Sequence, residues 1–94
     1  MAEARVLRAR GSHLYPGARA ALEGGVPEAA GPCLIEFADG AAAAGEIAPE
    51  GDGRLRLATA PYRTAAGTAI PEKRWLLERG GAGEWRVAGA VPGR

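Results

Sequence analysis

Turn-forming residues divide this sequence into short segments, and their spacing is the strongest constraint on its fold. The chain has 94 residues, of which 15 are glycine and 7 are proline. Turn signals recur about every ten to fifteen residues, a spacing typical of a small β-barrel or sandwich rather than of alternating strands and helices. We therefore expect one mainly β domain over residues 1–94.

The middle of the chain predicts an antiparallel meander. Residues 33–37 form a bulky apolar run that ends at Asp39-Gly40, a strong hairpin signal, and residues 41–47 return from it. Residues 54–58 then alternate strictly between arginine or alanine and leucine. Because successive side chains of a strand point to opposite faces, the leucines should face the core and the arginines the solvent.

The last third of the chain predicts three more strands. Residues 62–70 contain threonine and isoleucine, which favour strand, and Gly67 suggests a bulge or tight bend within it. Residues 74–78 and 85–88 flank a glycine-rich loop and should form a hairpin. We expect this hairpin to bring Trp75 and Trp85 close together in the core.

The first third of the chain is less regular. Residues 4–9 alternate weakly and fit a first strand. Residues 11–31 are punctuated by glycine and proline and predict a long loop with at most one short helix near residues 16–23, although the same residues would also serve as a short strand. The β core is therefore placed at residues 32–91, as a small antiparallel barrel or open meander of about six strands.

The apolar content of the chain predicts a thin core. Half of its hydrophobic residues are alanine, which number 22, and leucine, isoleucine, valine and phenylalanine together number 16. Burial in a homodimer or against a protein partner would add to so small a core, and the edge strand of an open meander offers unpaired backbone groups for such contact.

Composition also bears on compartment and source. Arginine supplies 11 of the 12 basic residues, which we attribute to a bacterial genome rich in GC codons because the net charge of +1 is too small to mark an anion-binding protein. No apolar run approaches the length of a membrane span, and no apolar segment follows the first arginines as in a secretory signal. With a single cysteine, these features predict a cytoplasmic protein that does not enter a membrane.

Residues with catalytic potential are few. Ser12 and His13 are sequence neighbours whose side chains would diverge in an extended segment, and Cys33 heads an apolar run, where cysteine is usually part of the core. One histidine and one cysteine are too few for a zinc site, and the glycines form no phosphate-binding loop. We therefore expect no cofactor, no metal and no catalytic residues, and a thiol-dependent enzyme using Cys33 and His13 is the third hypothesis.

Basic residues on the predicted strands mark the face most suited to binding. This candidate binding face consists of Arg54, Arg56, Tyr62, Arg63 and Arg74. The favoured function is a non-catalytic binding or assembly module that acts through a sheet edge or through this face. A small nucleic-acid-binding β-barrel is the second hypothesis, since such barrels combine a basic groove with aromatic platforms. The interspersed acids and the need for tryptophan in the core favour a mixed-charge surface instead.

Overall fold

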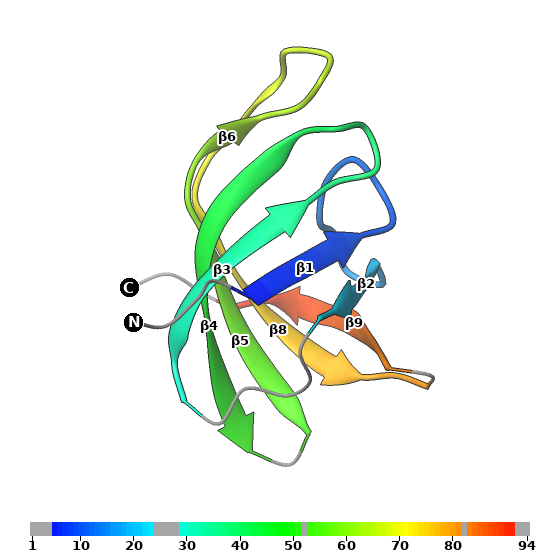
Figure 1. Cartoon of the computed structure of the whole chain (residues 1–94), viewed down its shortest axis with the longest axis vertical. Helices are drawn as coiled ribbons and strands as arrows, with labels where there is room; N and C mark the ends of the chain where they lie inside the picture. The colour runs from blue at the N-terminus through cyan, green and yellow to red at the C-terminus, as the bar shows by residue number, and fades with distance from the viewer. Residues whose placement is uncertain (1–4, 24–28, 52, 82, 92–94) are drawn as a thin grey trace.

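Strands follow one another along the whole described chain, without a helix. The structure is a computed structural model that describes residues 5–23, 29–51, 53–81 and 83–91 (Figure 1). Its strands are β1 (Arg5–Ala9), β2 (Arg19–Leu22), β3 (Gly31–Glu36), β4 (Ala42–Gly51), β5 (Arg54–Thr59), β6 (Tyr62–Arg63), β7 (Ala69–Ile70), β8 (Lys73–Arg79) and β9 (Glu84–Ala90).

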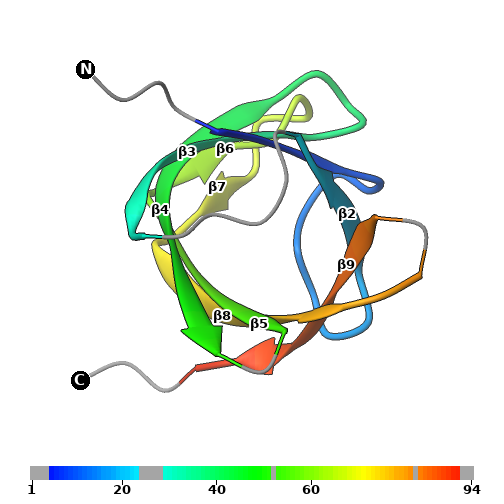
Figure 2. The same cartoon turned by 60° about the horizontal axis from the view of Figure 1, so that its bottom comes forward.

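Seven of these strands close into a barrel. Its order is β1-β2-β9-β8-β5-β4-β3, and β1 completes the ring by pairing in parallel with β3. Figure 2 shows the strands as a ring seen from one end. The predicted small β-barrel is confirmed, with slightly more strands than expected. Because closure pairs every barrel strand on both sides, the open meander and its free edge are not found among the described barrel strands.

The N-terminal third contributes two barrel strands. The predicted first strand is confirmed as β1, except for Ala4, which lies outside the described residues. Of the two alternatives for residues 16–23, the helix is wrong and the short strand is confirmed, because residues 19–22 form β2 between β1 and β9. Backbone pairing on both sides outweighs the helix preference of alanine, which amounts to less than about 1 kcal/mol per residue. Pro16-Gly17 forms a turn before this strand, in which Gly17 has a φ of 94°.

The predicted meander is confirmed as β3, β4 and β5, which pair in sequence. Asp39-Gly40 lies in the first hairpin, where the N–H of Gly40 donates to the carbonyl of Phe37. The loop is longer than a two-residue turn, since the N–H of Phe37 in turn donates to the carbonyl of Ala41. β4 also continues past the predicted end at Ile47 and reaches Gly51 through a register shift.

The strand predicted over residues 62–70 is wrong, because this segment forms a separate two-stranded hairpin, β6–β7. The N–H of Gly67 donates to the carbonyl of Thr64, and the N–H of Thr64 donates to the carbonyl of Thr68. The φ of 92° at Gly67 allows the chain to reverse there, so the predicted tight bend is confirmed and the alternative of a bulge is not. The hairpin projects beyond one end of the barrel (Figure 1).

The predicted C-terminal hairpin is confirmed as β8 and β9, but its tryptophans do not meet. The register sets Trp75 opposite Ala90 and Trp85 opposite Arg79, so the two indoles lie toward opposite ends of the hairpin. The short loop of the hairpin fixes this register. Both indoles are nevertheless buried, as the alternation predicted.

Inward-facing side chains fill the barrel. The most completely buried of these are Leu7, Ile35, Ile47, Leu55, Leu57, Leu77 and Val87. Gly45 of β4 is also part of this packing, because a Cβ atom there would overlap the carbonyl oxygen of Ala58 on β5 and approach Cδ1 of Ile35 to 3.2 Å. The bulky minority of residues is thus concentrated inside one barrel.

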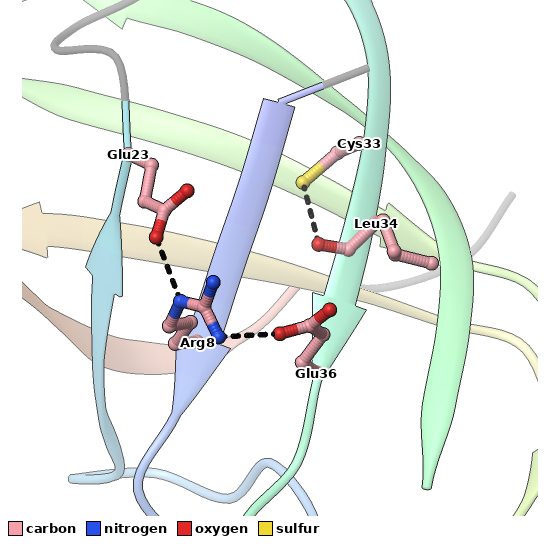
Figure 3. Close-up of polar contacts among 5 residues, drawn as sticks. All are labelled: Arg8, Glu23, Cys33, Leu34 and Glu36. Atoms are coloured by element: carbon pink, nitrogen blue, oxygen red, sulfur yellow. Dashed lines mark hydrogen bonds and ion pairs between the residues drawn. The ribbon is translucent and has the colours of Figure 1, made fainter.

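Ion pairs connect the strands on the outside of the barrel. Arg8 of β1 donates from Nε to Glu23 at 2.7 Å and from Nη1 to Glu36 of β3 at 2.6 Å (Figure 3). These contacts span the parallel β1–β3 pair and the antiparallel β1–β2 pair. The arginine side chain is 56% exposed, and exposed ion pairs contribute little to stability.

Candidate functional site

The outer face of β4, β5 and β8 carries a shallow groove between arginines. Residues directly opposite one another across these strands are Glu46, Ala58 and Arg74, while Ala48 lies opposite Arg56 in the next row. Small alanines between long side chains leave a hollow. The groove has a volume of about 250 Å³ and is lined by Ala30, Glu46, Ala48, Arg56, Leu57, Ala58, Arg74, Trp75 and Val91.

Arg56 and Arg74 are diagonal neighbours across the β5–β8 pair. Diagonal positions of a sheet lie about 7–8 Å apart, a distance that two arginine side chains can span toward one bound group. The N–H of Val91 donates to the carbonyl of Arg74 at 2.9 Å, which holds the apolar valine beside this arginine. The groove therefore presents two guanidinium groups next to an apolar surface of alanine and valine.

The two arginines of the groove differ in their partners. Nε of Arg56 lies 2.7 Å from Oε1 of Glu50. Arg74 has no ion-pair partner among the described residues, and neither has Glu46 at the other side of the groove. Arg74 thus offers its full set of donors to a ligand, whereas Arg56 shares its charge with a neighbouring carboxylate.

The structure divides the candidate binding face predicted from the sequence. Arg56 and Arg74 line the groove, but Nε of Arg54 lies 3.7 Å from Oε2 of Glu78, outside it. Tyr62 and Arg63 belong to the β6–β7 hairpin. Nη1 of Arg63 donates to the carbonyl of Gly67 within that hairpin, at 3.0 Å.

Within the described ranges, no exposed aromatic ring forms a platform beside the groove arginines. Trp75, Trp85 and Phe37 are only 4–6% exposed. The ring of Tyr62 stacks on Phe37 with centroids 4.8 Å apart, and Tyr15, at 46% exposed, lies outside the groove lining. Stacking on nucleic-acid bases therefore has no counterpart at the groove.

A second hollow, the end cleft, lies at the end of the barrel from which the β6–β7 hairpin projects. It runs between the loop after β1 and this hairpin and has a volume of about 580 Å³. Its lining consists of Ser12, His13, Asp39, Thr64, Ala65, Ala66, Thr68 and Ile70. The sequence indicated Ser12 and His13 only as catalytic candidates and did not group them with the other lining residues, because only the fold brings the loop and the hairpin together.

The end cleft brings serine, histidine and aspartate together without forming a catalytic triad. Oγ of Ser12 lies 3.3 Å from Nδ1 of His13, so the prediction that these side chains diverge is wrong: the segment bends instead of extending. Both carboxylate oxygens of Asp39 accept backbone N–H groups, from Ala41 and Ala65. The aspartate therefore orients the hairpin and not the histidine.

Cys33 and His13 are not brought together. Cys33 is 3% exposed, and it lines neither of the hollows to which His13 contributes. Its Sγ–H donates to the carbonyl of Leu34 at 3.9 Å (Figure 3). Burial raises the pKa of the thiol to about 11, which leaves it protonated and a poor nucleophile at neutral pH.

A metal site and a membrane-spanning helix have no basis in the described residues. In the described part of the chain, no three histidine, cysteine or acidic side chains are grouped so as to hold a metal ion. The same residues include no helix long and apolar enough to cross a membrane. Comparison with known protein families, curated proteins and solved structures gives no match for this chain.

Proposed function

We propose that this protein is a non-catalytic binding module whose groove on β4, β5 and β8 binds a segment of a partner protein that carries one carboxylate beside neutral residues. The observation that carries the proposal is the placement of Arg74, without an ion-pair partner among the described residues, diagonally across from Arg56. Arginine's planar group matches a carboxylate in two parallel hydrogen bonds.

The dimensions of the groove support a peptide side chain as its occupant. A volume of about 250 Å³ is below the roughly 300–1,000 Å³ of pockets that enclose a drug-sized molecule. It accommodates one carboxylate with an adjacent aliphatic group. Ala48, Ala58 and Val91 supply apolar contacts for the aliphatic part, and Arg56 and Arg74 face the carboxylate.

An acidic peptide is favoured over nucleic acid. Phosphate would also bind the two arginines, but single strands gain much of their affinity by stacking on aromatic side chains. Glu46 lines the same groove and would repel a run of phosphates. A carboxylate flanked by neutral residues avoids this repulsion.

The proposal is tested by titrating the ¹⁵N-labelled protein with an acetylated pentapeptide that has glutamate beside leucine, and with the matched glutamine peptide. We expect saturable shifts of the backbone N–H signals of Arg56, Ala58 and Arg74 with the glutamate peptide alone. Loss of a hydrogen-bonded charge in Arg74→Gln should weaken this binding by about tenfold or more. The control, Arg54→Gln, removes an arginine that pairs with Glu78 outside the groove and should bind as the unaltered protein does.

Three results would contradict the proposal. The first is equal binding of the two peptides, or no saturable shift at millimolar peptide. The second is tighter binding of an oligothymidine that weakens steeply with salt and is lost in Arg74→Gln, which would assign the groove to nucleic acid. The third is a dimer in sedimentation that Arg74→Gln dissociates, which would assign the groove to a second copy of this chain.

A further inference from the structure

A small chamber lies beside the end cleft. The chamber has a volume of about 60 Å³ and shares His13 and Ile70 with the end cleft. Its lining consists of His13, Leu14, Thr59, Tyr62, Ile70, Lys73 and Trp75. The end cleft is thus rich in hydroxyl groups, whereas the chamber is lined by a lysine, a tyrosine and a histidine together with apolar side chains.

Polar groups of the chamber have unused bonding capacity. Nζ of Lys73 lies 5.6 Å from the centre of the Trp75 ring, and it has no carboxylate partner among the described residues. The Tyr62 hydroxyl and Nε2 of His13 likewise have no hydrogen-bond partner within the described ranges. His13 and Lys73 are exposed and Tyr62 is half-buried, so all three groups are available to a polar guest in the chamber that they line.

The charges around the cleft select a singly charged guest. Lys73 provides a positive charge at the chamber, whereas Asp39 places a negative charge in the lining of the end cleft. The Asp39 carboxylate is already engaged by two backbone N–H groups and does not need a cation. A polyphosphate or a dicarboxylate would set a second negative charge against Asp39, while a neutral tail avoids that cost.

The volumes of the chamber and the end cleft indicate which part of the guest each one can hold. The chamber, at about 60 Å³, is less than half of the roughly 150 Å³ cavity that accepts benzene, so it excludes a ring but accepts a carboxylate with its neighbouring carbon. The end cleft is larger. Ser12 gives it a hydroxyl group on the side of the loop after β1, and Thr64 and Thr68 give it hydroxyl groups on the side of the hairpin.

We propose that the end cleft binds a small hydroxylated monocarboxylic acid, with its carboxylate in the chamber near Lys73 and its hydroxyl-bearing chain between Ser12 and Thr68. This site is separate from the arginine groove and has a different ligand class. Lys73 supplies the charge, the Tyr62 hydroxyl donates to the carboxylate, and the threonine hydroxyls bind the chain.

The test titrates the ¹⁵N-labelled protein with gluconate, and separately with sorbitol and hexanoate. Sorbitol lacks the carboxylate and hexanoate lacks the hydroxyl groups. We expect saturable shifts at His13, Thr68 and Lys73 with gluconate at millimolar concentration, and affinities at least about tenfold weaker for the two matched compounds. Equal response to gluconate and sorbitol, or no saturable shift, would overturn the proposal.

Variants separate binding from folding. Tyr62→Phe removes only a hydroxyl and keeps the ring stacked on Phe37, so it should fold normally and bind gluconate several-fold more weakly. Lys73→Gln should reduce binding by about tenfold or more, while Arg54→Gln, which removes a positive charge that does not line the chamber, should leave it unchanged. Unaltered gluconate affinity in both Tyr62→Phe and Lys73→Gln would show that the carboxylate does not enter the chamber.

Discussion

Oδ2 of Asp39 accepts a hydrogen bond from the backbone N–H of Ala65 at 2.9 Å, across 26 positions of the sequence. Its Oδ1 accepts the N–H of Ala41 at 3.0 Å in the β3–β4 loop. One carboxylate therefore ties the tip of the β6–β7 hairpin to the barrel and sets the width of the end cleft.

The Asp39→Asn variant should release the hairpin tip, because an amide group cannot accept on both sides. We expect faster hydrogen exchange at Ala65 in this variant and unchanged exchange in Glu72→Gln, which removes an exposed carboxylate after β7. Equal protection of Ala65 in the variant and the unaltered protein would show that Asp39 does not anchor the hairpin.

The same contact should depend on pH. The N–H of Ala65, followed by that of Ala41, lowers the pKa of Asp39 below its ordinary value of 3.8. A depressed carboxyl pKa means that the stabilisation is present above pH 3.8 and is lost as the pH falls through the folded value. The amide shift of Ala65 should therefore titrate with a midpoint below 3.8, and a midpoint above that value would contradict the assignment.

Stacking of Tyr62 on Phe37 should account for a measurable share of hairpin docking. The ring planes are 11° apart at a centroid distance of 4.8 Å, and such pairs contribute about 0.5–1.5 kcal/mol beyond burial. A double-mutant cycle with Tyr62→Leu and Phe37→Leu, followed by urea unfolding, should give a coupling free energy in this range. Tyr62→Phe is the control and should unfold at the same urea concentration as the unaltered protein.

Gly45 should be the glycine least tolerant of alanine in the barrel wall. Since an added Cβ would overlap the Ala58 carbonyl oxygen, Gly45→Ala should lower the free energy of unfolding by at least about 2 kcal/mol. Gly89 of β9 has open space at the same position, so Gly89→Ala should change it by less than about 0.5 kcal/mol. Similar urea midpoints for the two variants would show that β4 and β5 can separate without cost.

The thiol of Cys33 should be unreactive in the folded protein. Its raised pKa, caused by burial, predicts negligible reaction with a disulfide reagent at neutral pH until denaturant is added. Between pH 9.0 and about 11 the unfolded chain loses the thiol proton while the folded chain keeps it, so stability should fall as the pH rises. Cys33→Ala should lessen this fall, and rapid labelling of the native protein would refute the burial.

Most of the strands were predicted from local sequence patterns, and the errors arose where a strand depends on pairing with a segment distant in the sequence. Leu55 and Leu57 alternate with exposed residues, so their strand and its inward face follow from the sequence. The pairing of β2 with β9 leaves no such pattern, and the sequence of residues 16–23 therefore did not distinguish a short helix from a short strand. Gly67 predicted a change of chain direction, but only the hydrogen bonds from Gly67 to Thr64 and from Thr64 to Thr68 distinguish a hairpin from a bulge.

The candidate site was predicted in part for the same reason. Alternation placed Arg54 and Arg56 together on the outer face, but only the β5–β8 register shows that Arg54 faces Glu78 while Arg56 neighbours Arg74. Lys73 and Thr68 of the end cleft gave no signal, because their common location depends on how a loop and a hairpin approach one another.

The pairing of β2 with β9 has a consequence for synthesis on the ribosome. β2 begins at Arg19, whereas its partner ends at Ala90. A growing chain can assemble the meander as its strands emerge, but the ring cannot close until the final strand has left the exit tunnel. Until then β2 has β1 as its only partner strand, and the interior of the barrel stays open beside it.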